Sequence, residues 1–391
     1  MTHRGRALVA GGGVALAALA VALFLSPWSA APRRAAKSGL ARIGVTWPVD
    51  GDDGSVRASG SLPALPDAGW HHGGPLTADS LRGAVVVLAV FSDTHPSTFD
   101  VLPRLQAWHE AYARLGVRIV GVHAPEYAFA TDPAVVERLA ARLAVSFPIV
   151  ADPALQVLAS LERSGSEVLL VLAGPGGRLL DVRPAGDPAR DLPAFEAGLR
   201  AALAGAHPGR GFPAAAVPDT PAGGTASSVR TIRLGTASVA AGPLAGAAPG
   251  RAQPFTAQFR FEVEGAPYVP HPIGWWTPRP QGIEAARGGA AQFLAIRYDA
   301  SRVGVVASPP PSGPVRLWIL RDEKWLPAAA LGADARADAQ GASYVDVEAA
   351  GLYFVTRGPG EHVLKLSPES PGLALHALTF EPMTAESAPR R

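Results

Sequence analysis

Val85-Val86-Val87-Leu88-Ala89-Val90-Phe91 decides the fold of the first half of this sequence. Seven consecutive apolar residues predict a strand covered on both faces, as at the centre of an α/β sheet. The polar loop Asp93-Thr94-His95-Pro96-Ser97-Thr98 follows. Apolar residues then recur at helical spacing from Phe99 to Leu115, and Gly116 gives a helix-stop signal. Strand, loop and helix in this order indicate the first part of a β-α-β unit.

The residues around this unit continue the α/β pattern over 68–205. Ser97-Thr98-Phe99-Asp100 has the spacing of a capping box for the helix, and Gly174-Pro175-Gly176-Gly177 is typical of a hairpin. The remaining elements are predicted as strands at Val117–Val122, Phe147–Val150, Val168–Ala173 and Arg178–Val182, and as helices at Pro133–Ala144, Ala154–Glu162 and Leu192–Leu203. The sequence therefore predicts a mixed sheet flanked by helices.

After a linker over 206–228, rich in Ala, Pro, Gly and Thr, the hydrophobic period changes to two. Alternation occurs at Ala257–Glu264, Gln292–Tyr298, Val315–Leu320, Tyr344–Val347, His362–Leu366 and Leu373–Phe380. Pro309–Pro314 and Gly358-Pro359-Gly360 are read as turns. Many short alternating strands without a helical stretch predict an all-β, jelly-roll-like sandwich over 229–382, followed by a tail over 383–391.

Composition limits the function classes. The chain is 48% hydrophobic and 17% charged, a composition typical of globular proteins. Its 391 residues are enough for two domains. The formal net charge is +2, and no basic stripe with interleaved aromatic residues occurs, so we do not expect a nucleic-acid partner. The sequence contains no cysteine.

The N-terminal residues predict export. Arg4 and Arg6 precede Ala7–Leu25, a run of apolar and small residues without charge. Its length lies between that of a secretory signal and that of a membrane span. Residues 1–31 are therefore a membrane anchor or a cleaved signal, and 32–67, rich in Gly, Pro, Ser and Asp, a flexible tether. We expect the bulk of the chain on the periplasmic side of the cytoplasmic membrane.

The α/β half resembles the periplasmic thioredoxin-like domains of the TlpA and DipZ type. The resemblance covers about residues 68–203 and rests on Leu81-Arg82-Gly83, Leu102-Pro103, Ala107–Tyr112, Gly121–Phe129, Asp132-Pro133, Phe147-Pro148 and Gly177-Arg178. In the DipZ branch, a β-sandwich resembling carbohydrate-binding modules commonly follows. Residues 229–382 are similar to it through Gly351-Leu352-Tyr353 and Ala377-Leu378-Thr379-Phe380.

This resemblance implies which catalytic parts are missing. It places the family's two redox cysteines at His95 and Thr98, and the family's cis-proline at Val168. Thiol–disulfide exchange needs a thiolate as the attacking group, and this sequence supplies none. The family's oxidoreductase activity is therefore not expected here.

His95 is the main candidate binding residue of the α/β half. The positive end of the following helix should lower the pKa of its imidazole. A neutral His95 beside the Ser97 and Thr98 hydroxyls could bind an anion or activate a hydroxyl group. The alternative is that Ser97 and Thr98 only cap the helix, and that His95 is a solvated loop residue.

A metal site is not expected. His71 and His72 could combine with His95 or His123, but neighbouring side chains on a strand point apart and no close acidic residue completes a ligand set. The resemblance implies that His109, His123 and Glu126 pack and orient loops. No cofactor is expected.

Trp275-Trp276 is the candidate binding feature of the sandwich. On a strand the two rings face opposite sides, so one enters the core and the other could stack on a sugar or a protein. The alternative is that both are buried. Trp318 and Trp325 are expected to serve packing.

The sequence thus favours a degenerate thioredoxin-like protein that binds or scaffolds in the bacterial envelope. Its similarity to redoxins would then be a similarity of fold and not of activity. An envelope protein or a glycan is the expected partner, besides the membrane contacted by residues 7–25. Two alternatives stay open: an enzyme that uses His95, Ser97 or Thr98 without sulfur, and a glycan-binding protein that uses its C-terminal domain.

Overall fold

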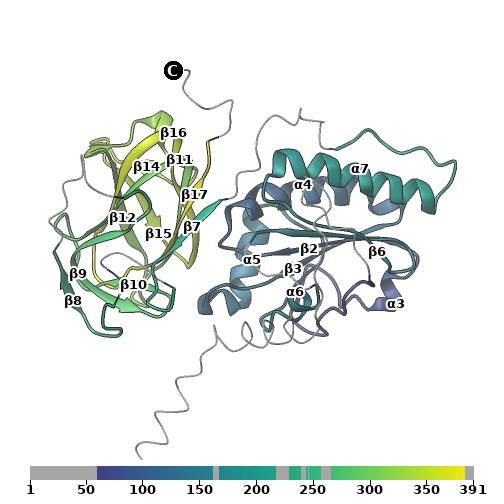
Figure 1. Ribbon diagram of the computed structural model, residues 1–391, viewed down its shortest axis with the longest axis horizontal. Coiled ribbons are helices and arrows are strands. Elements are labelled where there is room, and N and C mark those ends of the chain that lie inside the picture. The colour runs from purple at the N-terminus through teal and green to yellow at the C-terminus, as the bar shows by residue number, and fades with distance from the viewer. Residues whose placement is uncertain are drawn as a thin grey trace, which may run out of the picture. The chain divides into compact units, whose positions relative to one another are not determined.

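The structure is a computed structural model that describes residues 60–161, 167–216, 229–238, 244, 246–256 and 266–383 (Figure 1). The described residues belong to one compact unit. Four predicted segments lie outside the described residues: the anchor, most of the tether, the end of the linker and the strand at Ala257–Glu264.

The α/β domain is built on a six-stranded sheet with the order β1-β4-β3-β2-β5-β6. The central strands β2, β3 and β4 are parallel, whereas β1, β5 and β6 pair antiparallel to their neighbours. The strands are β1 (Trp70–His71), β2 (Val85–Phe91), β3 (Val117–His123), β4 (Ile149–Ala151), β5 (Leu169–Ala173) and β6 (Leu179–Pro184). The sheet is mixed and thioredoxin-like, as predicted.

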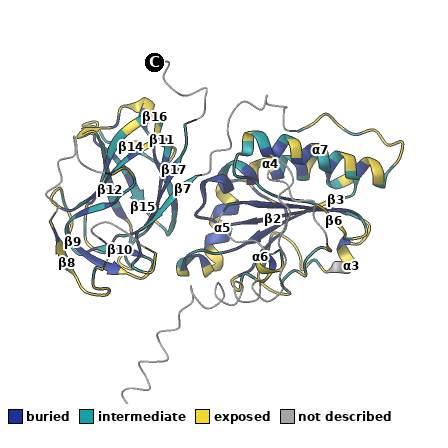
Figure 2. Ribbon diagram, in the orientation of Figure 1, coloured by how far each residue is buried: buried dark blue, intermediate teal, exposed yellow. Residues whose placement is uncertain are grey.

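Both faces of β2 are buried, as its continuous apolar run predicts (Figure 2). Alternate residues enter two hydrophobic clusters, with Val87 in the first and Leu88 in the second. The first cluster lies under α4 (Pro96–Tyr112), α5 (Pro133–Arg142) and α7 (Pro188–Ala206). The second includes residues of α3 (Ala78–Leu81) and α6 (Gln156–Ser160). The period of two along an extended strand produces this division.

The start of α4 differs from the prediction. The helix begins at Pro96, and its N-cap is His95 rather than Ser97: the His95 side chain accepts a hydrogen bond from the Ser97 backbone N–H. Proline suits the first helical position because its missing N–H is not needed there. At the other end, a short 3₁₀ turn leads to Gly116, whose φ of 97° ends the helix as predicted.

Among its described residues, the β domain has eleven strands that hydrogen bonds join into one sheet. These are β7 (Arg230–Arg233), β8 (Gln253–Phe255), β9 (His271–Arg279), β10 (Gly282–Ala285), β11 (Phe293–Ser308), β12 (Val315–Arg321), β13 (Lys324–Trp325), β14 (Arg336–Ala337), β15 (Ser343–Val347), β16 (Gly351–Pro368) and β17 (Ala374–Glu381). One continuous core fills the space between its layers. The predicted all-β sandwich is present.

Two of these strands are much longer than predicted. β11 pairs with β9 through its first residues and with β17 through its last, so it takes part in both layers of the sandwich. Its pairing with β16 shifts register between Ala300 and Arg302 and again between Val303 and Gly304. Such β-bulges bend a strand without ending it. Gly358-Pro359-Gly360 lies opposite the first shift, inside β16, so its reading as a turn is wrong.

The sequence analysis placed Trp275-Trp276 on a strand but gave no bounds for β9, and it did not predict β10. β9 carries Pro272 and Pro278, and proline inside a run argues against a strand. In the structure, Pro278 pairs with Ile283 in the β9–β10 ladder. Within the part of the chain that the structure describes, no helix is long and apolar enough to cross a membrane.

Candidate functional site

The loop between β2 and α4 holds the positions that the resemblance assigns to redox cysteines, and it is closed by internal hydrogen bonds. The His95 Nδ1 atom lies 2.7 Å from Ser97 Oγ and accepts the Ser97 N–H at 3.3 Å. Thr98 Oγ1 donates to the Ser92 carbonyl oxygen at 2.6 Å. Only 3% of His95 is exposed, so its reading as a solvated loop residue is wrong.

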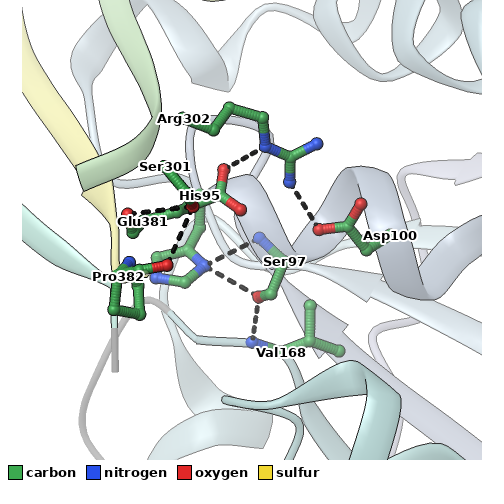
Figure 3. A network of polar contacts seen from close by, with 8 residues as sticks. All are labelled: His95, Ser97, Asp100, Val168, Ser301, Arg302, Glu381 and Pro382. Atoms are coloured by element: carbon green, nitrogen blue, oxygen red, sulfur yellow. Dashed lines mark hydrogen bonds and ion pairs between the residues drawn. The ribbon is translucent and has the colours of Figure 1, made fainter. Parts of the chain in front are cut away.

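Val168, the position implied for the lost cis-proline, lies against this loop. Its backbone N–H donates to Ser97 Oγ at 3.4 Å (Figure 3). Because Nδ1 of His95 accepts the Ser97 N–H, it carries no proton, and the Ser97 hydroxyl donates to it. Ser97 Oγ thus has its proton engaged by His95 and its lone pairs facing Val168. The structure brings His95, Ser97 and Val168 together, in a filled site rather than an open cleft.

The pKa of His95 is lowered to about 4, in the predicted direction. The largest cause is burial, which disfavours the imidazolium ion, and the second is the positive charge of Arg233. His95 is therefore neutral near pH 7.

The residues around this loop pack against the β domain. Phe99, in the first turn of α4, meets Phe354 of β16 edge to face with a ring separation of 5.2 Å. Both residues join a cluster with Tyr127, Leu352 and other apolar side chains from the two domains. Phe99 was predicted on the helix's apolar face, and here it packs partly against the domain's own core and partly against the β domain.

Ion pairs surround this apolar contact. The Arg302 guanidinium of β11 lies between two carboxylates: its Nη2 is 2.7 Å from Asp100 Oδ2, and its Nε contacts Glu381 (Figure 3). Ser301 Oγ donates to the Pro382 carbonyl oxygen at 2.8 Å. Arg142 of α5 reaches Asp334 at 2.9 Å.

A further polar connection leads back to the loop. Thr94 Oγ1 donates to Glu126 Oε2 at 3.2 Å, and Glu126 Oε1 receives the Arg233 guanidinium at 2.7 Å. Burial lowers the pKa of Arg233, but the pairing with Glu126 outweighs it, so the net shift is upward. No signal in the sequence pairs residues this far apart in the chain.

The contact of Ser97 with His95 has the distance of a nucleophile and its general base. A substrate would have to reach Ser97 Oγ, which lies in a residue that is 2% exposed and contacts the Val168 N–H. The same His95 nitrogen serves as the helix cap. The arrangement supplies a hydrogen-bond acceptor for a backbone N–H group in the first turn of α4, and it leaves no room for a substrate atom.

His71 and His72 do not point apart as predicted. His72 has a φ of 56° and leaves the extended conformation, so both imidazoles reach one carboxylate, Glu137 of α5. The distances are 2.5 Å from His71 Nδ1 and 3.5 Å from His72 Nε2. His123 instead pairs with Asp93, at 2.9 Å. Glu137 is the acidic partner that the sequence analysis did not find.

In the β domain, Trp276 and Trp275 face opposite sides of β9. Trp276 is fully buried in the core, and its Nε1–H donates to the Ile273 carbonyl oxygen at 2.9 Å. Trp275 is half-buried, and the Arg287 guanidinium lies 4.6 Å from its ring centre.

A second aromatic group lies on the β12–β15 ladder, where packing residues were predicted. Trp318 is 5.9 Å from Trp325 and 5.7 Å from Tyr344 between ring centres. Arg316 covers Tyr344 at 3.9 Å and binds Asp346. Trp325 is 43% exposed, although its ring also contacts Trp318. The signal that could have found this group is alternation in two neighbouring strands, Arg316-x-Trp318 and Tyr344-x-Asp346.

Comparison with known proteins agrees with this fold. Residues 246–380 match the family described as "Thioredoxin like C-terminal domain". The protein DipZ of Mycobacterium bovis (strain ATCC BAA-935 / AF2122/97) and that of Mycobacterium tuberculosis (strain CDC 1551 / Oshkosh) are each 34% identical over 101 residues. Part of this chain is thus similar to the protein DipZ. The match covers 25% of the chain and spans 14% of the DipZ length.

Solved structures similar to this chain include a thiol-disulfide isomerase from Corynebacterium glutamicum, with 22% identity and a TM-score of 0.31. That match covers 38% of this chain and 98% of the isomerase. Peroxiredoxin Q of Xanthomonas campestris is 17% identical with a TM-score of 0.31, over 37% of this chain and 98% of that protein. The chain described here contains no cysteine.

Proposed function

We propose that this chain is a cysteine-free, DipZ-type thioredoxin-like protein of the bacterial envelope that binds or scaffolds another molecule instead of exchanging disulfides. The observation that carries the proposal is His95. It occupies one of the two positions that the resemblance gives to redox cysteines, and it is buried, neutral and engaged as a helix cap. A thiolate cannot be replaced by a neutral imidazole in thiol–disulfide exchange.

The contacts of the β domain support the same proposal. In the chain's own fold, Phe354, Arg302 and Arg233 lie against the residues that flank the degenerate loop. A partner would therefore meet other surfaces of the molecule. The proposal includes export and anchoring through residues 7–25, whose apolar run in the sequence supports it.

The direct test is insulin reduction by the purified chain in the presence of a thiol reductant. We expect turnover equal to that of the buffer control, because no residue of the chain forms a mixed disulfide. Turnover above this control that scales with protein concentration would refute the proposal. Anchoring is tested separately by fractionating cells that express the chain with and without residues 1–31; both forms in the soluble fraction would contradict it.

A second candidate is glycan binding by the β domain, and the aromatic group on β12, β13 and β15 favours it. Aromatic faces stack on sugar rings, and Trp325 offers an exposed face beside Trp318. Glycan-array binding that disappears in Trp325→Ala and persists in Trp275→Ala would support this use. Binding lost in Trp275→Ala but kept in Trp325→Ala would move the site to β9, and no binding at all would reject the glycan.

A further inference from the structure

A cavity of about 280 Å³ lies at the carboxyl ends of β3 and β4, beside the start of α5. Its walls are mainly apolar and include Trp70, Pro125, Pro133 and Val136. Two imidazoles, His71 and His123, also line it. The carboxyl ends of strands are where open α/β sheets bind ligands. The volume is just below the roughly 300 Å³ at which pockets for drug-sized ligands begin, so an occupant would be small.

Each of the two imidazoles is held by a carboxylate. His71 Nδ1 lies 2.5 Å from Glu137 Oε1, and His123 Nε2 lies 2.9 Å from Asp93 Oδ1. A carboxylate accepts the ring N–H, so the opposite nitrogen of a neutral imidazole is left as an acceptor. These nitrogens are Nε2 of His71 and Nδ1 of His123. The ring hydrogen bonds that the structure shows for the two residues are those of the opposite nitrogens to Glu137 and Asp93.

The surroundings limit what can bind there. Apolar walls make it costly to place a strongly hydrated ion in the cavity. Glu137 and Asp93 contact the two imidazoles, and Asp132 lines the cavity itself. The negative charge of these carboxylates opposes the binding of an anion. What remains is a small apolar molecule that donates a hydrogen bond. We propose that this cavity binds small alcohols or phenols, whose hydroxyl group donates to His71 or His123.

The proposal does not depend on the chain's redox chemistry, and phenol is a suitable probe. Phenol is titrated into the full chain while the imidazole signals are followed by nuclear magnetic resonance with ¹⁵N-labelled histidine. We expect saturable shifts confined to His71 and His123. Toluene, which has the same ring without a donor, and benzoate, which carries a charged acceptor, should both bind at least about tenfold more weakly, as expected for loss of one hydrogen bond.

Two variants locate the site. Ala151→Leu adds side-chain volume at a residue that lines the cavity and should abolish the shifts. His71→Phe keeps an aromatic ring but removes the acceptor and should weaken binding about tenfold. His362→Phe is the matched control, because His362 also pairs with a carboxylate, Asp322, in the β domain; phenol affinity should not change.

The proposal is overturned if phenol gives no saturable shift of His71 or His123. It is also overturned if toluene or benzoate binds as tightly as phenol, a comparison that needs no variant and so does not depend on variant folding. Unchanged phenol affinity in a folded Ala151→Leu chain would place the binding elsewhere and reject this cavity.

Discussion

Arg233 of β7 lies 2.7 Å from Glu126, the residue that also accepts a hydrogen bond from Thr94 beside His95. Three side chains thus connect the loop between β2 and α4 of the α/β domain to the first described strand of the β domain. Arg233 also contributes to the lowered pKa of His95. The protonation state of His95 is therefore set partly by the second domain.

Arg302→Ala should destabilise the contact between the two domains. The substitution removes the partner of both Asp100 and Glu381, and burial already raises the pKa of Glu381. Because the Arg302 and Asp100 side chains are about one-third exposed, we expect a loss of about 1–2 kcal/mol, less than for a fully buried pair. Urea unfolding and the rate of limited proteolysis measure the effect.

Arg297→Ala is the control for this prediction, because Arg297 lies on the same strand and pairs with Glu361 at a more exposed position. We expect a change of less than about 0.5 kcal/mol. Equal stability losses in the two variants would mean that the Arg302 contacts add nothing specific.

His95 should make the chain less stable as the pH falls from 6.5 to 4. Its pKa is about 4 in the folded chain, against 6.5 for an ordinary histidine, so the unfolded chain binds more protons over this range. The free energy of unfolding therefore rises with pH, and the neutral imidazole is worth at most about 3 kcal/mol above pH 6.5. His95→Asn keeps a helix-capping side chain and removes this titration.

Urea unfolding at several pH values compares the two chains. The slope of stability against pH between pH 4 and 6.5 should be smaller for His95→Asn than for the parent chain. His362→Asn, a substitution at a histidine of the β domain, is the control and should not reduce the slope to the same extent. Parallel curves for the parent and His95→Asn would contradict the burial of a neutral His95.

His95→Cys combined with Thr98→Cys tests whether the packing of the β domain beside the loop between β2 and α4 blocks redox chemistry. The two positions lie in one helical turn, since the Thr98 N–H donates to the His95 carbonyl oxygen at 3.1 Å. We expect the two thiols to be oxidisable, as measured by thiol titration. Insulin turnover should stay near the buffer control because residues of the β domain pack beside this loop. Robust insulin reduction by the double variant would show that the loop is accessible to substrates.

Trp276→Ala and Trp275→Ala should differ sharply in their effect on stability. Trp276 is fully buried, so its truncation leaves a cavity and should cost about 3–5 kcal/mol. Trp275 is half-buried beneath Arg287, and its truncation should cost less than about 2 kcal/mol. The denaturation midpoint of the β domain measures both. Similar midpoints in the two variants would contradict the assignment of the two faces of β9.

The elements that the sequence predicted best are those in which local pattern and burial agree. Val85–Phe91 is buried on both faces because it is the central strand, and its apolar run has no polar position to expose. Asp132 and Pro133 start α5 as predicted, through the contact of the Asp132 side chain with the Ala134 N–H. The prediction of a turn at Gly358-Pro359-Gly360 is wrong because these residues form a bulge within β16 instead of ending a strand.

The sequence by itself determined that a thioredoxin-like sheet precedes a β-sandwich and that no thiol is present, because hydrophobic periodicity and composition are properties of the chain. Only the tertiary structure decided that His95 is buried and neutral, and that Trp325 rather than Trp276 is exposed. These properties depend on neighbours such as Arg233, which folding brings close from distant parts of the chain. Burial and charge at a residue are sums over such neighbours, and the linear pattern does not contain them.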